Sequence, residues 1–246
     1  MLALDIVNIA ATISSVVLLF SPFPDFRRVH TEQSTGEVRI LPVMMLCVNC
    51  FTWAMYGYLS GTYFPVFAIN AAGTITSLVF STVFYRWSSD RSALHKMGAA
   101  VFGWMAFVIE FIVLCKSDVI SISSDKLEKI VGYLAVALNI CLYASPLRTM
   151  KLVLSTKSAA SLPAMMCCVN LVNGSLWVLY GILANDMFVL TPNAMGVVLS
   201  AIQVVLCIKY RPNRRAEDNV KDVSVTASPA VEDGIAIDFV KMHSPV

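Results

Sequence analysis

Charged residues are scarce in this sequence. Only 14% of its 246 residues are Asp, Glu, Lys or Arg, whereas 57% are hydrophobic and the mean hydropathy is +0.72. Because a soluble domain carries about 25% charged residues, this scarcity excludes an ordinary water-soluble domain. The net charge of +2 is too small to indicate nucleic-acid binding.

Motifs of catalysis and metal binding are also missing. The three histidines are far apart, and no GxSxG, Walker A or HExxH motif occurs. All the cysteines fall within or at the ends of apolar stretches, which is typical of packing thiols rather than disulfides or metal ligands. We therefore expect no catalytic residue, metal or cofactor. The cysteines are Cys47, Cys50, Cys115, Cys141, Cys167, Cys168 and Cys207.

The sequence also lacks any Lys or Arg before Arg27, so it has no basic segment of the kind that begins a cleaved signal peptide. The first apolar stretch is accordingly interpreted as a retained helix. Spanning a bilayer takes about 20 mostly apolar residues, and seven stretches qualify. They cover approximately 4–22, 40–59, 64–85, 97–115, 130–150, 164–183 and 187–208. The predicted fold class is an all-α integral membrane protein with seven transmembrane helices.

Lys and Arg residues near the helix ends predict the orientation, because they concentrate on the cytosolic side. Only Lys116, Lys126 and Lys129 lie on one side of the predicted membrane. The N-terminus is therefore predicted outside and the C-terminus in the cytosol. The larger group on the other side is Arg27, Arg28, Arg39, Arg86, Arg91, Lys96, Arg148, Lys151, Lys157, Lys209, Arg211, Arg214 and Arg215.

One membrane unit occurs twice. Residues 21–58 align without a gap on residues 145–182 at an offset of 124, and the offset becomes 123 further on. The coinciding residues include Ser21/Ser145, Pro22/Pro146, Asn49/Asn173, Trp53/Trp177, Tyr56/Tyr180, Gly57/Gly181, Asn70/Asn193 and Gly73/Gly196. Two three-helix units can run parallel only if one extra helix separates them. We predict a 3+1+3 arrangement with a first bundle at 1–87, a linker helix at 88–129, a second bundle at 130–211 and a disordered cytosolic tail at 212–246.

The paired polar residues inside the repeat are the candidate binding site. Polar side chains buried among apolar helices are costly unless they are satisfied. An amide donates and accepts, as a hydroxyl does, and a tryptophan face stacks on the apolar face of a sugar ring. The plain alternatives are hydrogen bonds between helices for Asn70 and Asn193, and interfacial anchoring for Trp53 and Trp177. Their matched positions favour a shared site on the repeat axis.

Ionisable groups are nearly missing from the apolar stretches, and Glu110 is the one acid well inside a predicted helix. It belongs to the linker helix, away from the repeat axis. A pore of Asn and Trp without fixed charge suits an uncharged polar substrate. Glu110 has either a proton-linked role or the plainer one of a snorkelling or locally paired carboxylate.

Four prolines lie near helix ends on the predicted cytosolic side. Pro22 and Pro146 are predicted to end the first and fifth helices, and Pro42 and Pro163 to begin the second and sixth. Each removes a backbone donor and loosens the local hydrogen bonding. Ordinary helix-end placement is the alternative to a flexible inner mouth.

Together these residues resemble the SWEET family of sugar transporters over about 1–211. The joint pattern is SPFPDF, QST, LP, NCFTWAMYG and IN in the first half, and SPL, TKS, LP, VNGSLWVLYG and TPN in the second. SWEETs are themselves an example of parallel-repeat transporters. The resemblance implies that Asn70 and Asn193 bind sugar and that Trp53, Trp177, Asn49, Asn173, Leu18 and Leu142 line the pocket. It also implies an inner gate of Pro22, Pro42, Pro146 and Pro163, and an outer gate of Tyr56 and Asp186.

The expected function is facilitative sugar uniport by alternating access. Two Trp and two Asn leave less room than the small pocket residues of sucrose carriers, which favours a hexose such as glucose. The alternatives are a proton-coupled small-solute carrier and a seven-helix receptor or scaffold. The expected partners are the sugar and the lipid bilayer, with self-association implied by the resemblance and no nucleic acid. The expected location is the plasma membrane, with an internal membrane as the alternative.

Overall fold

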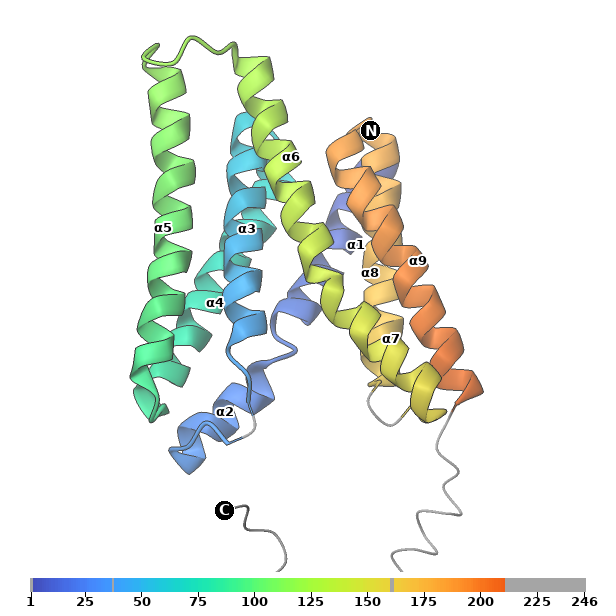
Figure 1. Ribbon diagram of the computed structural model, residues 1–246. Coiled ribbons are helices and arrows are strands. Elements are labelled where there is room, and N and C mark those ends of the chain that lie inside the picture. Colours follow the sequence, from blue (N-terminus) through green and yellow to red (C-terminus); the bar gives the residue numbers. More distant parts are fainter. Residues whose placement is uncertain (1, 37, 160–161, 211–246) are drawn as a thin grey trace, which may run out of the picture.

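A computed structural model describes residues 2–36, 38–159 and 162–210 (Figure 1). The cytosolic tail predicted at 212–246 lies outside these residues. The described part is helical and contains no strand. Its elements are α1 (Leu2–Leu19), α2 (Phe23–Glu32), α3 (Leu41–Leu59), η1 (Tyr63–Phe67), α4 (Ala68–Trp87), α5 (Arg91–Lys116), α6 (Ser124–Leu142), α7 (Ala144–Thr156), α8 (Ala164–Leu183) and α9 (Met187–Lys209).

Seven helical spans are long and apolar enough to cross a membrane, as the sequence predicts. Many large apolar side chains on their outer surfaces are exposed, among them Ile9, Phe102, Phe107, Val198 and Ile208. Such a surface is stable against lipid and costly in water. The predicted all-α membrane fold is thereby confirmed.

The prediction that Pro22 and Pro146 end the first and fifth helices is only partly correct. The regular helices stop at Leu19 and Leu142, but helical structure resumes as α2 and α7 and continues to Glu32 and Thr156. Proline is tolerated in the first turn of a helix, where its missing N–H is not needed. The prolines therefore mark breaks within two longer spans.

Tertiary packing explains why α2 forms after the break. Phe26 and Val29 of α2 are buried, and the Phe26 ring stacks on Phe80 of α4 with centroids 4.6 Å apart. The sequence of α2 is too polar to show as an apolar stretch. Its helical structure depends on this one buried face.

The two repeats are arranged in the same way. In each bundle the third helix lies between the first and the second: α4 between α1 and α3, and α9 between α6 and α8. The first helices cross between the bundles (Figure 1). α1 packs on α8 of the other bundle and α6 packs on α3, whereas their continuations α2 and α7 rest on α4 and α9 of their own bundles. The α1–α8 and α3–α6 contacts are therefore the two equivalent junctions between the bundles.

Glycines allow the second and third helices of each bundle to approach closely. A Cβ added at Gly57 of α3 would lie 2.7 Å from the backbone nitrogen of Phe67. A Cβ added at its repeat partner Gly181 of α8 would lie 2.9 Å from the backbone of Leu190. No side chain larger than hydrogen fits at either position without moving the backbone.

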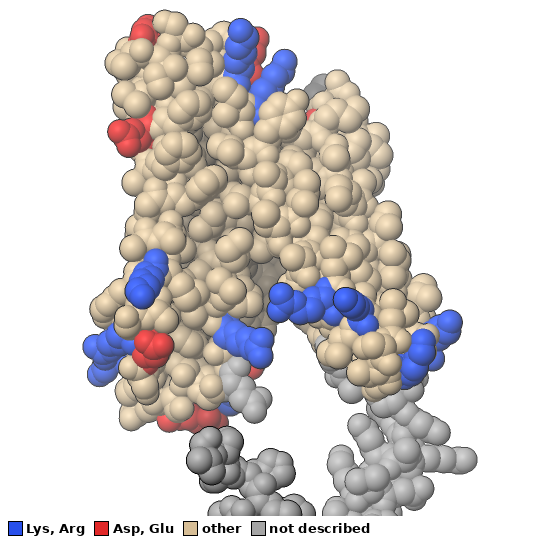
Figure 2. Space-filling view, viewed as in Figure 1, with Lys and Arg blue, Asp and Glu red and all other residues tan. Residues whose placement is uncertain are grey.

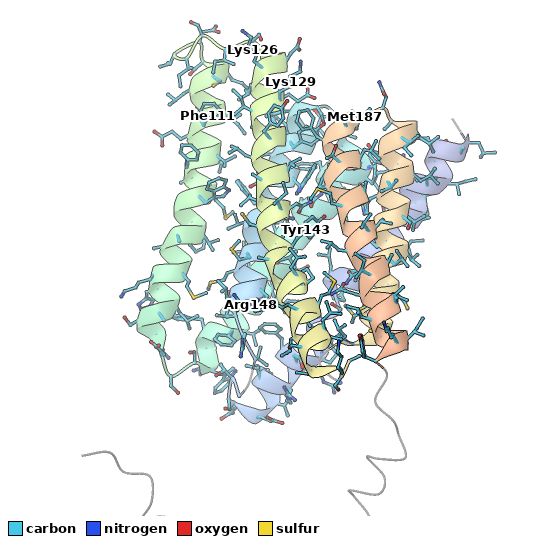
Figure 3. The ribbon with its side chains drawn as sticks, turned by 45° about the vertical axis from the view of Figure 1, so that its right-hand side comes forward. Phe111, Lys126, Lys129, Tyr143, Arg148 and Met187 are labelled. Atoms are coloured by element: carbon cyan, nitrogen blue, oxygen red, sulfur yellow. The ribbon has the colours of Figure 1, made fainter. Side chains whose placement is uncertain are left out.

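The two ends of the molecule differ in charge. Lys and Arg side chains gather at the end that carries α2, α7 and the end of α9, which is called the basic end below (Figure 2). Lys126 and Lys129 lie at the opposite end, called the far end, and Arg148 lies on α7 (Figure 3). α1 begins at the far end and α9 ends at the basic end. Under the predicted orientation the basic end faces the cytosol.

Candidate functional site

A cavity of about 210 Å³ lies between the two bundles. Its wall combines amide, indole, hydroxyl and thiol groups with aliphatic side chains, and none of the residues that line it is charged. It is lined by Ser15, Leu18, Leu19, Leu46, Asn49, Cys50, Trp53, Val66, Ile69, Asn70, Asn139, Asn173, Trp177, Val189 and Asn193. All three predicted Asn and Trp pairs therefore meet at one place.

Asn70 and Asn193 have the same geometry in the two bundles. Each donates its Nδ2 to the backbone carbonyl four residues earlier, Asn70 to Val66 and Asn193 to Val189, both at 2.8 Å. This bond fixes the amide against its own helix. The Oδ1 acceptor and the second N–H of each amide stay available to a ligand.

The two other pairs differ between the junctions. At the α1–α8 junction, Ser14 and Ser15 both donate to Asn173 Oδ1, at 2.8 and 2.9 Å. Trp177 donates its Nε1 to Ser15 Oγ at 2.9 Å. Four side chains thus form one hydrogen-bonded network between the first helix of one bundle and the second helix of the other.

At the α3–α6 junction no equivalent network occurs among the described residues. Asn49 is 9% exposed, and its buried Oδ1 has no hydrogen-bond partner there. Trp53, which is 5% exposed, likewise has no described partner for its Nε1. An unpaired buried acceptor costs about 1–3 kcal/mol, so Asn49 Oδ1 is an unsatisfied polar group at this junction.

The two leucines singled out by the resemblance are placed differently. Leu18 lines the central cavity, whereas Leu142 is half-buried and is not among its lining residues. The next residue, Tyr143, lies at the break between α6 and α7 (Figure 3). Its hydroxyl donates to the carbonyl of Pro192 and lies 3.0 Å from where a Cβ on Gly196 would be, so the glycine makes room for the phenol.

The far end of the cavity is closed. Tyr56 Oη donates to Asp186 Oδ1 at 2.9 Å, which joins α3 to the start of α9. The same carboxylate oxygen accepts the backbone N–H groups of Phe188 and Val189 and so caps α9. The Phe188 ring packs against Tyr56 and, edge-on, against Tyr133 of α6. The two residues of the predicted outer gate are therefore in direct contact.

The basic end is open. A second cavity of about 390 Å³ shares Asn173 and Asn193 with the central one and extends toward α7 and the start of α8. The space-filling view is hollowed between the two halves at this end (Figure 2). Pro146 and Pro163 line this second cavity, and Pro22 and Pro42 of the other bundle do not. The four prolines are thus not gathered in this conformation.

Glu110 lies away from both cavities. It is exposed on α5, and neither cavity includes it among its lining residues. The linker helix α5 instead joins α3 through Trp104, which donates its Nε1 to Thr52 Oγ1 at 3.0 Å. A proton carried by this carboxyl would have no contact with a substrate in the central cavity.

Several site residues were not predicted from the sequence: Ser14, Ser15, Asn139, Tyr143, Tyr133 and Phe188. Ser15 and Asn139 carried a usable signal, since they are 124 residues apart and both are polar within apolar helices. Phe188 carried none, because its role depends on the space above Gly132.

The chain matches one family profile twice, over residues 5–92 and 129–215. That family is described as "Sugar efflux transporter for intercellular exchange". The two matched segments contain most of the first and second bundles and leave out most of the linker helix α5. Each of the two matches therefore covers one repeat.

Individual proteins are similar over most of their length. The bidirectional sugar transporter SWEET1b of Oryza sativa subsp. japonica is 32% identical over 218 residues, which cover 87% of this chain and 82% of that protein. The bidirectional sugar transporter SWEET5 of Arabidopsis thaliana is 28% identical, covering 89% and 91%. A solved eukaryotic SWEET transporter matches with a TM-score of 0.71 at 24% identity, covering 86% of this chain and 98% of that one, and this match shows the fold.

Proposed function

The chain belongs to the family of SWEET sugar transporters, and from that premise we propose that it is a facilitative uniporter for hexoses such as glucose. The members of this family are transporters and not enzymes. The chain is a multi-pass integral membrane protein. We place it in the plasma membrane, with the basic end in the cytosol.

The uncharged cavity between the bundles is the observation that carries the proposal. Amino acids, nucleotides and ions would each need a countercharge, and none of the residues that line the cavity supplies one. Amides can both donate to and accept from sugar hydroxyls. The faces of Trp53 and Trp177 can cover the apolar face of a ring. A neutral polyhydroxylated ring meets all three conditions.

Cavity size supports a monosaccharide. Pockets for drug-sized ligands typically measure about 300–1,000 Å³, whereas the central cavity measures about 210 Å³. A disaccharide would extend into the open vestibule at the basic end. We therefore expect glucose to be transported faster than sucrose.

The difference between the two ends supports alternating access. In the present conformation the Tyr56–Asp186 bond closes the far end while the basic end is open. Rocking of the bundles about the cavity would bring Pro22, Pro42, Pro146 and Pro163 together and separate Tyr56 from Asp186. Breaks in helical hydrogen bonding at prolines lower the cost of such bending. Self-association of copies is also expected, as the family resemblance implies.

Uptake of labelled glucose and sucrose by cells expressing the chain in a hexose-transport-deficient yeast tests this proposal. Glucose uptake well above the empty-vector control, exceeding sucrose uptake, is expected. Equal uptake of the two sugars would contradict the hexose assignment. No uptake of any sugar, with the protein present at the cell surface, would contradict the transport function and favour a receptor or scaffold.

A further inference from the structure

The cavity has two halves that the repeat relates, and their hydrogen bonding differs. One half is the α1–α8 junction, with Ser15, Asn173 and Trp177. The other half is the α3–α6 junction, where the repeat equivalents of those residues are Asn139, Asn49 and Trp53. If sequence symmetry alone decided the chemistry, both halves would offer a ligand the same groups.

The polar groups of the α1–α8 half are largely occupied by one another. Asn173 Oδ1 accepts from Ser15, and it shares the single hydroxyl proton of Ser14 with the carbonyl of Ala11. Trp177 has a single N–H, and it is bonded to Ser15 Oγ. Apart from the amide N–H groups of Asn173, little hydrogen-bonding capacity remains for a ligand on this side.

The polar groups of the α3–α6 half are free. Asn49 Oδ1 is buried and unpaired, and no hydrogen bond joins the side chains of Trp53 or Asn139 to another residue in the described part of the chain. Rotation of the Asn49 amide about its last bond would turn Oδ1 toward the cavity. A ligand on this side would meet the Asn49 and Asn139 amides and the Trp53 indole N–H, none of which is hydrogen-bonded to another described side chain.

Two sequence differences produce this asymmetry. The repeat position of Ser14 is Leu138, which packs against the apolar cluster of Cys47, Val48 and Val101 rather than reaching an amide. The repeat position of Ser15 is Asn139, which has no described partner. Two adjacent serines therefore complete a network in one junction that the other junction cannot form.

We infer that Ser14 and Ser15 are positioning residues that clamp α1 to α8 through Asn173 and Trp177, and that sugar hydroxyls bind to the opposite half, at Asn49, Trp53 and Asn139. The inference rests on the proposed sugar transport. It assigns one half of the cavity to holding the helices together and the other half to binding the sugar. The clamp joins the two bundles in the conformation that is open at the basic end. It stabilises that conformation without contacting the sugar through its own acceptors.

A matched pair of substitutions separates the two halves. Asn49→Ala and Asn173→Ala remove the same group from repeat-related positions. We expect Asn49→Ala to raise the Kd for D-glucose by about threefold to tenfold, the effect of losing one or two neutral hydrogen bonds. Asn173 also lines the cavity, but Asn173→Ala should raise the Kd less than Asn49→Ala does. Isothermal titration calorimetry on full-length protein in lipid nanodiscs measures both.

The clamp is tested by its effect on conformation. Spin labels at Glu32→Cys and Thr156→Cys report the width of the mouth at the basic end, because these exposed positions end α2 and α7 and are repeat equivalents. The exposed thiols of Cys141 and Cys168 are first replaced by alanine. In this background, Ser14→Ala with Ser15→Ala should shift the electron-resonance distance distribution to shorter values and change the maximal transport rate. Its effect on the glucose Kd should be smaller than that of Asn49→Ala. Ser15→Thr, which keeps the hydroxyl, should restore the wild-type distribution.

The outcomes are distinct. Equal weakening of glucose binding by Asn49→Ala and Asn173→Ala would overturn the division of the cavity. An unchanged distance distribution in the folded double serine variant, checked by its unfolding temperature, would overturn the clamp. Failure of the wild-type protein to bind glucose or any other sugar would overturn the proposed function and the ligand half of this inference, while the distance measurement would still decide the clamp.

Discussion

The amides of Asn70 and Asn193 show how a single residue type serves both the helix and the ligand. One N–H of each is bonded to its own helix at 2.8 Å, so the side chain loses little further rotamer freedom when a ligand arrives. The carbonyl oxygen and the second N–H remain for hydroxyl groups. A preorganised amide of this kind gains affinity by lowering the ordering cost of binding.

Replacing either amide should therefore impair transport directly. Asn70→Ala and Asn193→Ala are each expected to reduce glucose uptake by about tenfold, because a ligand hydroxyl loses its hydrogen-bond partner. Thr82→Ala, on the exposed face of the same helix as Asn70, is the control and should transport normally. Uptake unaffected by both Asn variants, at matched expression, would disprove their assignment to the site.

The two gate residues at the far end, Tyr56 and Asp186, should differ in their effect on stability, because only Asp186 also caps a helix. Asp186 bonds Tyr56 and also caps α9, whereas Tyr56 Oη contributes only the gate bond. Tyr56→Phe should cost at most about 1 kcal/mol of unfolding free energy, and Asp186→Ala should cost about 1 kcal/mol more through the lost cap. Thermal unfolding of the purified variants measures the difference.

Tyr56→Phe should also open the far end. Spin labels at Tyr63→Cys and Met187→Cys, exposed positions near the starts of the third helices, report this opening. In a background lacking Cys141 and Cys168, the variant should populate longer distances than wild type. An identical distribution would mean that the aromatic packing of Phe188, rather than the hydrogen bond, keeps this end shut.

At the scale of the elements, the glycines of α3 and α8 determine how tightly each bundle packs. Gly57→Ala and Gly181→Ala should each destabilise the protein by about 1–3 kcal/mol, because a Cβ would overlap backbone that cannot move aside. Gly103→Ala on α5 is the matched control, since nothing lies within 4 Å of its added Cβ. There the better helix propensity of alanine should raise stability slightly. Similar unfolding temperatures for all three variants would contradict the close-packing account.

Hydropathy predicted the membrane spans well and the helical structure near the basic end poorly. The sixth span, expected at 164–183, is α8 at those residues. By contrast, α2 and the end of α7 were missed, because both helices are amphipathic and have a proline at or near their start. The stacking of Phe26 on Phe80 that holds α2 in place is a tertiary contact and leaves no local signal.

At the scale of the molecule, two bundles in the same orientation surround a site without charged residues. The acid that the sequence places well inside a helix lies outside this site. Glu110 is exposed on α5. Glu110→Gln should therefore leave glucose transport unchanged, and collapsing a pH gradient should not alter the final internal concentration in proteoliposomes. Accumulation above equilibrium that disappears with the gradient would instead show proton coupling.

Sequence symmetry predicted which residues gather at the centre but not which hydrogen bonds they form. The pairs Asn49/Asn173, Trp53/Trp177 and Asn70/Asn193 all line one cavity. Their hydrogen bonds differ because Ser14 and Ser15 reach Asn173 across a junction between bundles. Which partners meet across that junction depends on the crossing of α1 and α6, and no spacing within one repeat specifies it.

Counterflow in proteoliposomes tests the central claim most directly. Vesicles containing the wild-type protein and loaded with unlabelled glucose should take up labelled glucose in a transient overshoot, without any ion gradient. The Asn70→Ala, Asn193→Ala double variant should show none, although it reconstitutes equally well. Absence of an overshoot with wild type for glucose and for every other sugar tried, or an undiminished overshoot in the double variant, would contradict a neutral sugar site between the two bundles.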